Sequence, residues 1–153
     1  MKTIGRHLIA EYYQCDADVL DDVELVRGAM LDAAHAVGAT VLGQVFHRFD
    51  PHGVSGTVVI AESHLSVHTW PENGYVAVDI YTCGGLDPRK GFDLLQRRLG
   101  ARSARVQEIL RGLPEELDAS HVLTPDNVHI MSRTTPLEGF SPRGVGRASG
   151  AAA

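Results

Sequence analysis

A chain of 153 residues falls in the size range of one folded domain and can bury a hydrophobic core without disulfides or a structural metal. Its 44% hydrophobic and 22% charged residues are typical of a globular protein, not of a disordered or fibrous one. The net charge of −5 and the scattered Arg and Lys residues argue against nucleic acid as a partner and favour a small molecule or a protein.

Cysteine usage and the N-terminus both point to the cytoplasm. Cys15 and Cys83 are the only cysteines and lack CxxC spacing, which excludes a disulfide framework and a zinc ribbon. The first apolar run is too short for a signal peptide, since Glu11 and Asp16 interrupt it, and no stretch is long enough to span a bilayer. We therefore expect a cytoplasmic protein without a membrane partner.

The first part of the chain predicts one helix among strands. A strand over residues 7–13 ends at a polar segment in which Asp16 or Asp18 could cap a helix. Apolar residues at helical spacing predict one helix over 19–37, ended by Gly38. Strands are predicted over 39–49 and 57–63, joined as a hairpin by the turn "DPHGVSG".

The next segment, 64–70, alternates strictly in polarity and predicts a strand with one polar face, formed by His64, Ser66, His68 and Trp70. A turn, a strand over 75–83, a helix over about 89–99 and a last strand over 103–110 follow.

This order predicts an α+β fold, a two-layer sandwich in which helices cover one face of a mostly antiparallel sheet. The domain should span residues 1–112. Beyond Gly112 the pattern weakens, and we expect 113–153 to be a partly disordered C-terminal extension.

Taken residue by residue, the polar side chains leave several readings open. Four histidines could converge as imidazole ligands of a metal, although their spacing matches no zinc signature: His47, His52, His64 and His68. Ser55 or Ser63 could be a hydrolase nucleophile, but "GVSGT" is not the G-x-S-x-G elbow.

For the other candidates, the ordinary structural role is the default. Cys83 lies at a predicted strand end, where a thiol can face a cleft, yet a free cysteine is more often a small buried hydrophobe. Phe49 and Trp70 default to core packing, and Glu72 to a solvated surface.

Four segments in order resemble the prokaryotic S-adenosylmethionine decarboxylase proenzymes: "GRHLIAEYYQCD", "GVSG", "ESHLSVHTWPE" and "YTCG". The resemblance runs to about residue 110 and implies a pyruvoyl enzyme that cleaves itself between Glu62 and Ser63, giving chains 1–62 and 63–153. In this family, the serine on the downstream side of the cleaved bond, here Ser63, becomes the pyruvoyl cofactor after an N-to-O acyl shift and β-elimination. The resemblance makes His68 the base of processing and Ser55 its support.

For turnover, the resemblance implies a Schiff base between the pyruvoyl group from Ser63 and the substrate amine, loss of carbon dioxide, and protonation by Cys83. The product would be the aminopropyl donor for spermidine synthesis. Phe49 is expected to stack on adenine and Glu72 to hold ribose hydroxyls, with Trp70 as a further substrate contact. A homodimer of processed protomers is implied, and no metal.

Two alternatives stay open at this point. The shared catalytic residues fix the reaction type better than the substrate, so a pyruvoyl decarboxylase of ornithine or arginine is the nearest rival. Asn73, in "PENGY", stands where an aromatic residue is expected in many relatives. A non-catalytic relative that keeps the fold without cleavage is the other alternative.

Overall fold

The computed structural model describes residues 4–113 and the backbone of 130–134. Seven strands form one sheet in the order β2-β3-β4-β5-β1-β6-β7, and every neighbouring pair is antiparallel. The elements in chain order are β1 (Gly5–Tyr13), α1 (Ala17–Asp21), α2 (Val23–Ala36), β2 (Thr40–Arg48), β3 (Val54–Ala61), β4 (Ser63–Trp70), the 3-10 turn η1 (Pro71–Asn73), β5 (Tyr75–Cys83), α3 (Pro88–Arg98), β6 (Ser103–Arg111) and β7 (Ile130–Thr134).

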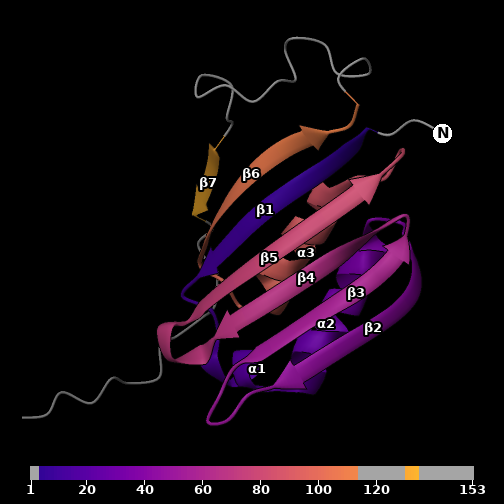
Figure 1. Ribbon diagram of the computed structural model, residues 1–153. Coiled ribbons are helices and arrows are strands. Elements are labelled where there is room, and N and C mark those ends of the chain that lie inside the picture. Colours follow the sequence, from indigo (N-terminus) through magenta and orange to yellow (C-terminus); the bar gives the residue numbers. More distant parts are fainter. Residues whose placement is uncertain (1–3, 114–129, 135–153) are drawn as a thin grey trace, which may run out of the picture.

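The helices lie on one face of this sheet, as the two-layer prediction requires (Figure 1). α2 packs on β2, β3 and β4, and α3 on β1 and β5. Strand alternation sends one set of side chains into this layer, where Leu8, Leu65 and Ile80 are at most 1% exposed. Within the described residues, no helix covers the opposite face, called here the uncovered face. None of the helices in that part of the chain is long and apolar enough to cross a membrane.

The predicted single helix over 19–37 is wrong in one respect, because the structure has two helices with a break at Asp22. The backbone of Asp22 is extended, and its carboxylate accepts hydrogen bonds from the amides of Glu24 and Leu25 at the start of α2. An aspartate that caps the next helix favours a new start over continuation. Asp16 caps α1 in the same way, as predicted, by accepting from the amide of Asp18.

The strand boundaries also correct the predicted turn between the second and third strands. Ser55, expected in the turn, lies in β3, and the connection between β2 and β3 spans only residues 49–53. Gly53 has φ of +100° and closes the loop by accepting from the Phe49 amide. This conformation is available to glycine at low cost, so the loop can be short and β3 can begin early.

The strand over 103–110 is not the last one. β7 pairs with β6 from within the segment expected to be a C-terminal extension, with Val106 opposite Met131. The expectation of partial disorder concerns residues 114–129 and 135–153, which lie outside the described part.

Candidate active site

Ser55 and His68 face each other across the β3–β4 hairpin. They are register partners in neighbouring antiparallel strands, and the Ser55 hydroxyl oxygen lies 2.7 Å from Nδ1 of His68. Both side chains lie on the uncovered face, because the alternate residues Val54, Val67 and Thr69 are buried on the helix side. The sequence predicted both residues as functional, and the structure joins them as a hydrogen-bonded pair.

The predicted cleavage point, Glu62–Ser63, lies at the tip of the same hairpin. β3 ends at Ala61 and β4 begins at Ser63, so Glu62 is the one residue between the two strands and is exposed. Ser63 and Leu65 are two residues apart on β4, so both side chains point to the helix side of the sheet. The Ser63 hydroxyl oxygen is buried there without a hydrogen-bond partner. A buried hydroxyl left unpaired costs about 1–3 kcal/mol, so a serine kept there needs a reason beyond packing.

The structure does not bring His68 to Ser63 within one chain. Five strand residues at about 3.3 Å each put their Cα atoms about 16 Å apart, and their side chains point to opposite faces of the sheet. The Ser55–His68 pair is therefore at one end of the hairpin, and the Glu62–Ser63 bond at the other.

Cys83 lies at the end of the sheet that carries Ser63. It is the last residue of β5, is a free and half-buried thiol, and pairs with Gly5 of β1. Because His64 pairs with Tyr81, the Glu62–Ser63 bond and Cys83 lie at the same end of the β4–β5 pair. The other free cysteine is different, since burial raises the pKa of Cys15 to about 12.

Sequence reasoning missed two polar groups on the uncovered face between these ends. Asp79 accepts from Ser66 at 3.1 Å and lies 3.2 Å from Nε2 of His7. The hydrogen bond with His7 lowers the pKa of Asp79, and Ser66 contributes while burial opposes the shift. Tyr81, whose ring contacts His7 and His64, is the second group. Alternation within "YVAVDIYTC" would have put both on the face of Cys83.

The three predicted substrate contacts lie near the Ser55–His68 end, and the aromatic ones do not fill the core. Phe49 is 47% exposed and Trp70 is 39% exposed, so the default of core packing is wrong for both. Trp70 stacks on Tyr75 with ring centres 5.1 Å apart. Glu72 forms an ion pair with His52 at 3.1 Å.

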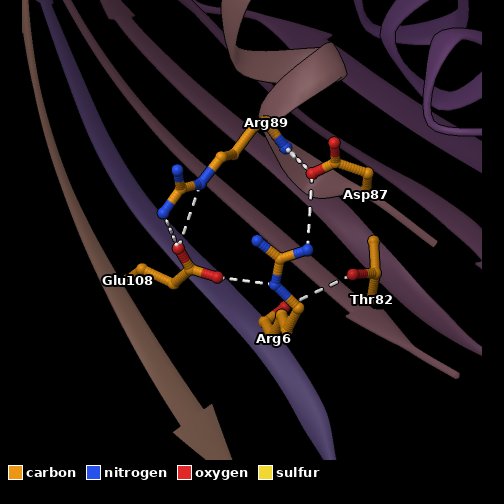
Figure 2. Close-up of polar contacts among 5 residues, drawn as sticks. All are labelled: Arg6, Thr82, Asp87, Arg89 and Glu108. Carbon is orange, nitrogen blue, oxygen red and sulfur yellow. Dashed lines mark hydrogen bonds and ion pairs between the residues drawn. The ribbon is translucent and has the colours of Figure 1, made fainter. Parts of the chain in front are cut away.

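The loop after Cys83 is tied to the sheet by a charged network on the helix side (Figure 2). Asp87 caps α3 by accepting from the Arg89 amide, and it also lies 3.4 Å from the Arg6 guanidinium. Figure 2 shows Arg6 and Arg89 converging on the two oxygens of Glu108. Thr82, next to Cys83, donates to the Arg6 carbonyl. The network fixes the start of α3 against β1 and β6, and so anchors both ends of the segment from Cys83 to Asp87.

Burial on its own would raise the pKa of Glu108, but the hydrogen bonds from Arg6 and Arg89 outweigh it, and the net pKa is lowered. The carboxylate is thus held ionised by its two partners.

The four histidines weighed as metal ligands lie apart in separate contacts. His47 packs edge-on against Phe49, His52 pairs with Glu72, and His64 contacts Tyr81. Across residues 4–113 and 130–134, no three His, Cys, Asp or Glu side chains are grouped so that they could hold a metal ion.

Comparison with known proteins gives consistent matches. Residues 6–112 match the family described as S-adenosylmethionine decarboxylase. The chain is 50% identical over 129 residues to the S-adenosylmethionine decarboxylase proenzyme of Thermotoga petrophila, covering 81% of this chain and 99% of the relative. It is 45% identical over 124 residues to the S-adenosylmethionine decarboxylase proenzyme of Geobacillus sp. (strain WCH70), covering 80% of this chain and 100% of the relative. The crystal structure of the adenosylmethionine decarboxylase from Aquifex aeolicus superposes with a TM-score of 0.69 at 37% identity, covering 77% of this chain and 98% of that one.

Together, the single antiparallel sheet and these matches define a carboxy-lyase made as a proenzyme. The chain belongs to the S-adenosylmethionine decarboxylase family, and to its prokaryotic type. The resemblance inferred from the sequence is thereby confirmed.

The surroundings of Ser63 fit the pyruvoyl group on which this family depends. Conversion of a serine to pyruvoyl replaces the hydroxymethyl group by a methyl group. The buried Ser63 oxygen has no partner, so the methyl group would lose no hydrogen bond and would remove an unsatisfied polar atom. The surroundings of this position therefore suit the pyruvoyl group better than the serine from which it is made.

Proposed function

We propose that the chain cleaves itself between Glu62 and Ser63 and then decarboxylates S-adenosylmethionine, releasing carbon dioxide and the aminopropyl donor for spermidine synthesis. The observation that carries the proposal is the buried, unpartnered Ser63 hydroxyl at the tip of a hairpin whose other end holds a Ser–His pair. The reaction needs a free thiol at Cys83, so we propose the reducing cytoplasm as its location.

Processing needs only groups of the protein and water. The Ser63 oxygen attacks the Glu62 carbonyl carbon, its proton passes to the leaving nitrogen, and the amide becomes an ester. A base then removes the Ser63 α-hydrogen, the Cβ–O bond breaks, and the Glu62 carboxylate leaves. The resulting enamine takes up a proton at Cβ and becomes an imine, and water then replaces the imine nitrogen, which departs as ammonia. His68 is the proposed base, because a neutral imidazole titrates near the working pH, and the Ser55 hydroxyl is the proposed donor to the oxyanion of the first step.

The separation of about 16 Å between Ser63 and His68 supports processing by a second copy of the chain. We propose a homodimer in which the uncovered faces of two sheets pack together around a two-fold axis that runs across the strands. Such an axis reverses the strand direction, so the Ser55–His68 end of one copy lies over the Ser63–Cys83 end of the other.

The chemistry of the uncovered face supports this interface. Val45 of β2 is 69% exposed and Val59 of β3 is 46% exposed, and their register makes them diagonal neighbours on the uncovered face. Trp70 is 39% exposed and lies on the same face at the Ser55–His68 end. Monomeric proteins rarely leave such groups in contact with water unless they form a binding surface.

In turnover, the pyruvoyl carbonyl supplies an electron-withdrawing group that takes up the electron pair released when carbon dioxide departs. Cys83 is the proposed proton donor to the substrate carbon. Its place at a strand end, beside the Ser63 end of the hairpin, supports this role. Phe49 and Trp70 offer exposed aromatic faces for the adenine, and Glu72 a carboxylate for the ribose hydroxyls.

Carbon dioxide release from carboxyl-labelled S-adenosylmethionine, ornithine and arginine tests the substrate. We expect release from S-adenosylmethionine with the wild-type chain and none with Ser63→Ala. Release from ornithine or arginine instead would assign the alternative substrate, and folded wild-type protein that turns over none of the three would favour the non-catalytic alternative.

A further inference from the structure

Tyr81 has a position on the sheet that brings its hydroxyl to Cys83. The two residues are two apart on β5, so both side chains lie on the uncovered face. A Cβ atom built on Gly5 would come 2.5 Å from Cε2 of Tyr81 and 2.7 Å from its hydroxyl oxygen, so the ring leans over this glycine. Gly5 is the register partner of Cys83. Side chains of directly opposed residues are close neighbours, so the phenol oxygen lies beside the thiol.

Other contacts hold the ring in this place. The Arg111 guanidinium carbon is 4.7 Å from the ring centre, and the rings of His7 and His64 are 5.5 and 5.8 Å away. Burial raises the pKa of Tyr81, as does the contact with Cys83, while Arg111 opposes the shift. The phenol therefore keeps its proton at neutral pH and can donate it in a hydrogen bond.

We propose that Tyr81 is a positioning residue for Cys83: it donates a hydrogen bond to the sulfur, orients the thiol along the uncovered face and stabilises the thiolate that proton delivery leaves. Gly5 is the residue that makes this arrangement possible. The inference rests on the proposed role of Cys83 as proton donor.

The proton balance of the step is simple. The S–H bond of Cys83 breaks while a C–H bond forms at the substrate carbon from which carbon dioxide left, and the S–H electron pair stays on sulfur. Tyr81 keeps its own proton throughout and only shares it in the hydrogen bond. Water returns a proton to the thiolate before the next turnover.

The test is the pH profile of Cys83 alkylation by iodoacetamide, read by peptide mass in the full-length Ser63→Ala chain. This background neither cleaves nor turns over, so the profile is independent of activity. Loss of a hydrogen bond to the thiolate in Tyr81→Phe should move the midpoint up by about one pH unit. Tyr13→Phe is the matched control, because the Tyr13 hydroxyl bonds Glu11 at 2.6 Å and lies near the far end of β1. Cys15, with its pKa raised to about 12, is the internal slow-reacting thiol.

Gly5→Ala gives a second route to the same effect with the phenol intact, because its Cβ pushes the ring away. We expect the midpoint to rise here too, and to stay in place in Gly43→Ala, where a new Cβ meets nothing within 4 Å. In the processing-competent chain, Tyr81→Phe should lower kcat about tenfold and leave KM within about twofold. A midpoint that stays or falls in folded Tyr81→Phe and Gly5→Ala would overturn the inference. Wild-type protein that never cleaves would instead contradict the proposed function and leave the alkylation result intact.

Discussion

The Ser55 hydroxyl lies 2.7 Å from Nδ1 of His68, while the serine that this pair is proposed to process is at the opposite end of the same hairpin. The hairpin thus holds the two ends of the proposed processing site apart within one chain. In the proposed homodimer, a second copy reversed across a two-fold axis places its Ser55–His68 end over the Ser63 end of the first copy.

Mixed dimers test this arrangement. A His68→Ala chain should stay uncleaved alone, because every site lacks the base. Co-expressed with a Ser63→Ala chain, it should be cleaved at its own Ser63, since the partner supplies His68. Gel analysis with a different tag on each variant shows which of the two chains has been cleaved. A His68→Ala chain that stays intact in purified mixed dimers would contradict processing by the partner.

Ser55→Ala should slow self-cleavage by at least about tenfold, since it removes the hydroxyl that positions His68 and is proposed to donate to the oxyanion. The cleaved fraction of freshly purified proenzyme, followed over time, measures the effect. Ser66→Ala is the control, because that hydroxyl also lies on the uncovered face of the hairpin but bonds Asp79. Equal cleavage rates for the two variants would argue against a role for Ser55.

Thr69 stabilises the end of β4 that carries His68, through two hydrogen bonds to backbone groups. Its buried hydroxyl donates to the Leu20 carbonyl at 2.8 Å and accepts from the Val54 amide at 2.7 Å. Thr69→Val keeps the shape but leaves both backbone groups unpaired, and should lower the free energy of unfolding by about 2 kcal/mol. Urea unfolding measures this, with Thr57→Val on the uncovered face as control. A loss no larger than that of the control would mean that these hydrogen bonds add no stability.

The Glu108 network predicts a pH dependence of stability. Because the folded pKa of Glu108 is lowered, its contribution is present above the unfolded value of about 4.3 and is lost as pH falls through the folded value. Glu108→Gln should therefore cost about 1–2 kcal/mol at pH 7, and the difference from wild type should shrink below about pH 4. Glu24→Gln, which breaks an exposed pair with Arg27, should change stability far less. A wild-type advantage that does not depend on pH would contradict an ionic origin.

The sequence predicted the two-layer fold well, because strand and helix periods are read directly from apolar spacing. The strand over 75–83 has the bounds of β5, and the polar face of 64–70 is confirmed by the buried Leu65 and Val67 on its other side. The helix break at Asp22 was missed, since the apolar pattern continues through it and only the cap ends α1. β7 was missed because a short edge strand in a Pro- and Ser-rich segment has no clear alternation of its own.

The sequence predicted a set of site residues but not their geometry. Ser55, Ser63, His68 and Cys83 were named from the motif, but the motif alone did not show that β4 runs without a break from Ser63 to His68 and holds their Cα atoms about 16 Å apart. The hairpin register adds that Ser55 lies opposite His68. Tyr81 was missed because its contact with Cys83 depends on the missing side chain of Gly5, a residue 76 positions away on another strand.

Intact-mass analysis of the purified wild-type chain beside Ser63→Ala tests self-cleavage at Glu62–Ser63 most directly. We predict two fragments for the wild type, 1–62 and 63–153, the second lighter by one ammonia than a fragment that begins with serine, and one uncleaved chain for Ser63→Ala. A wild-type protein that remains one chain, or a second fragment that keeps an amino-terminal serine, would contradict the account.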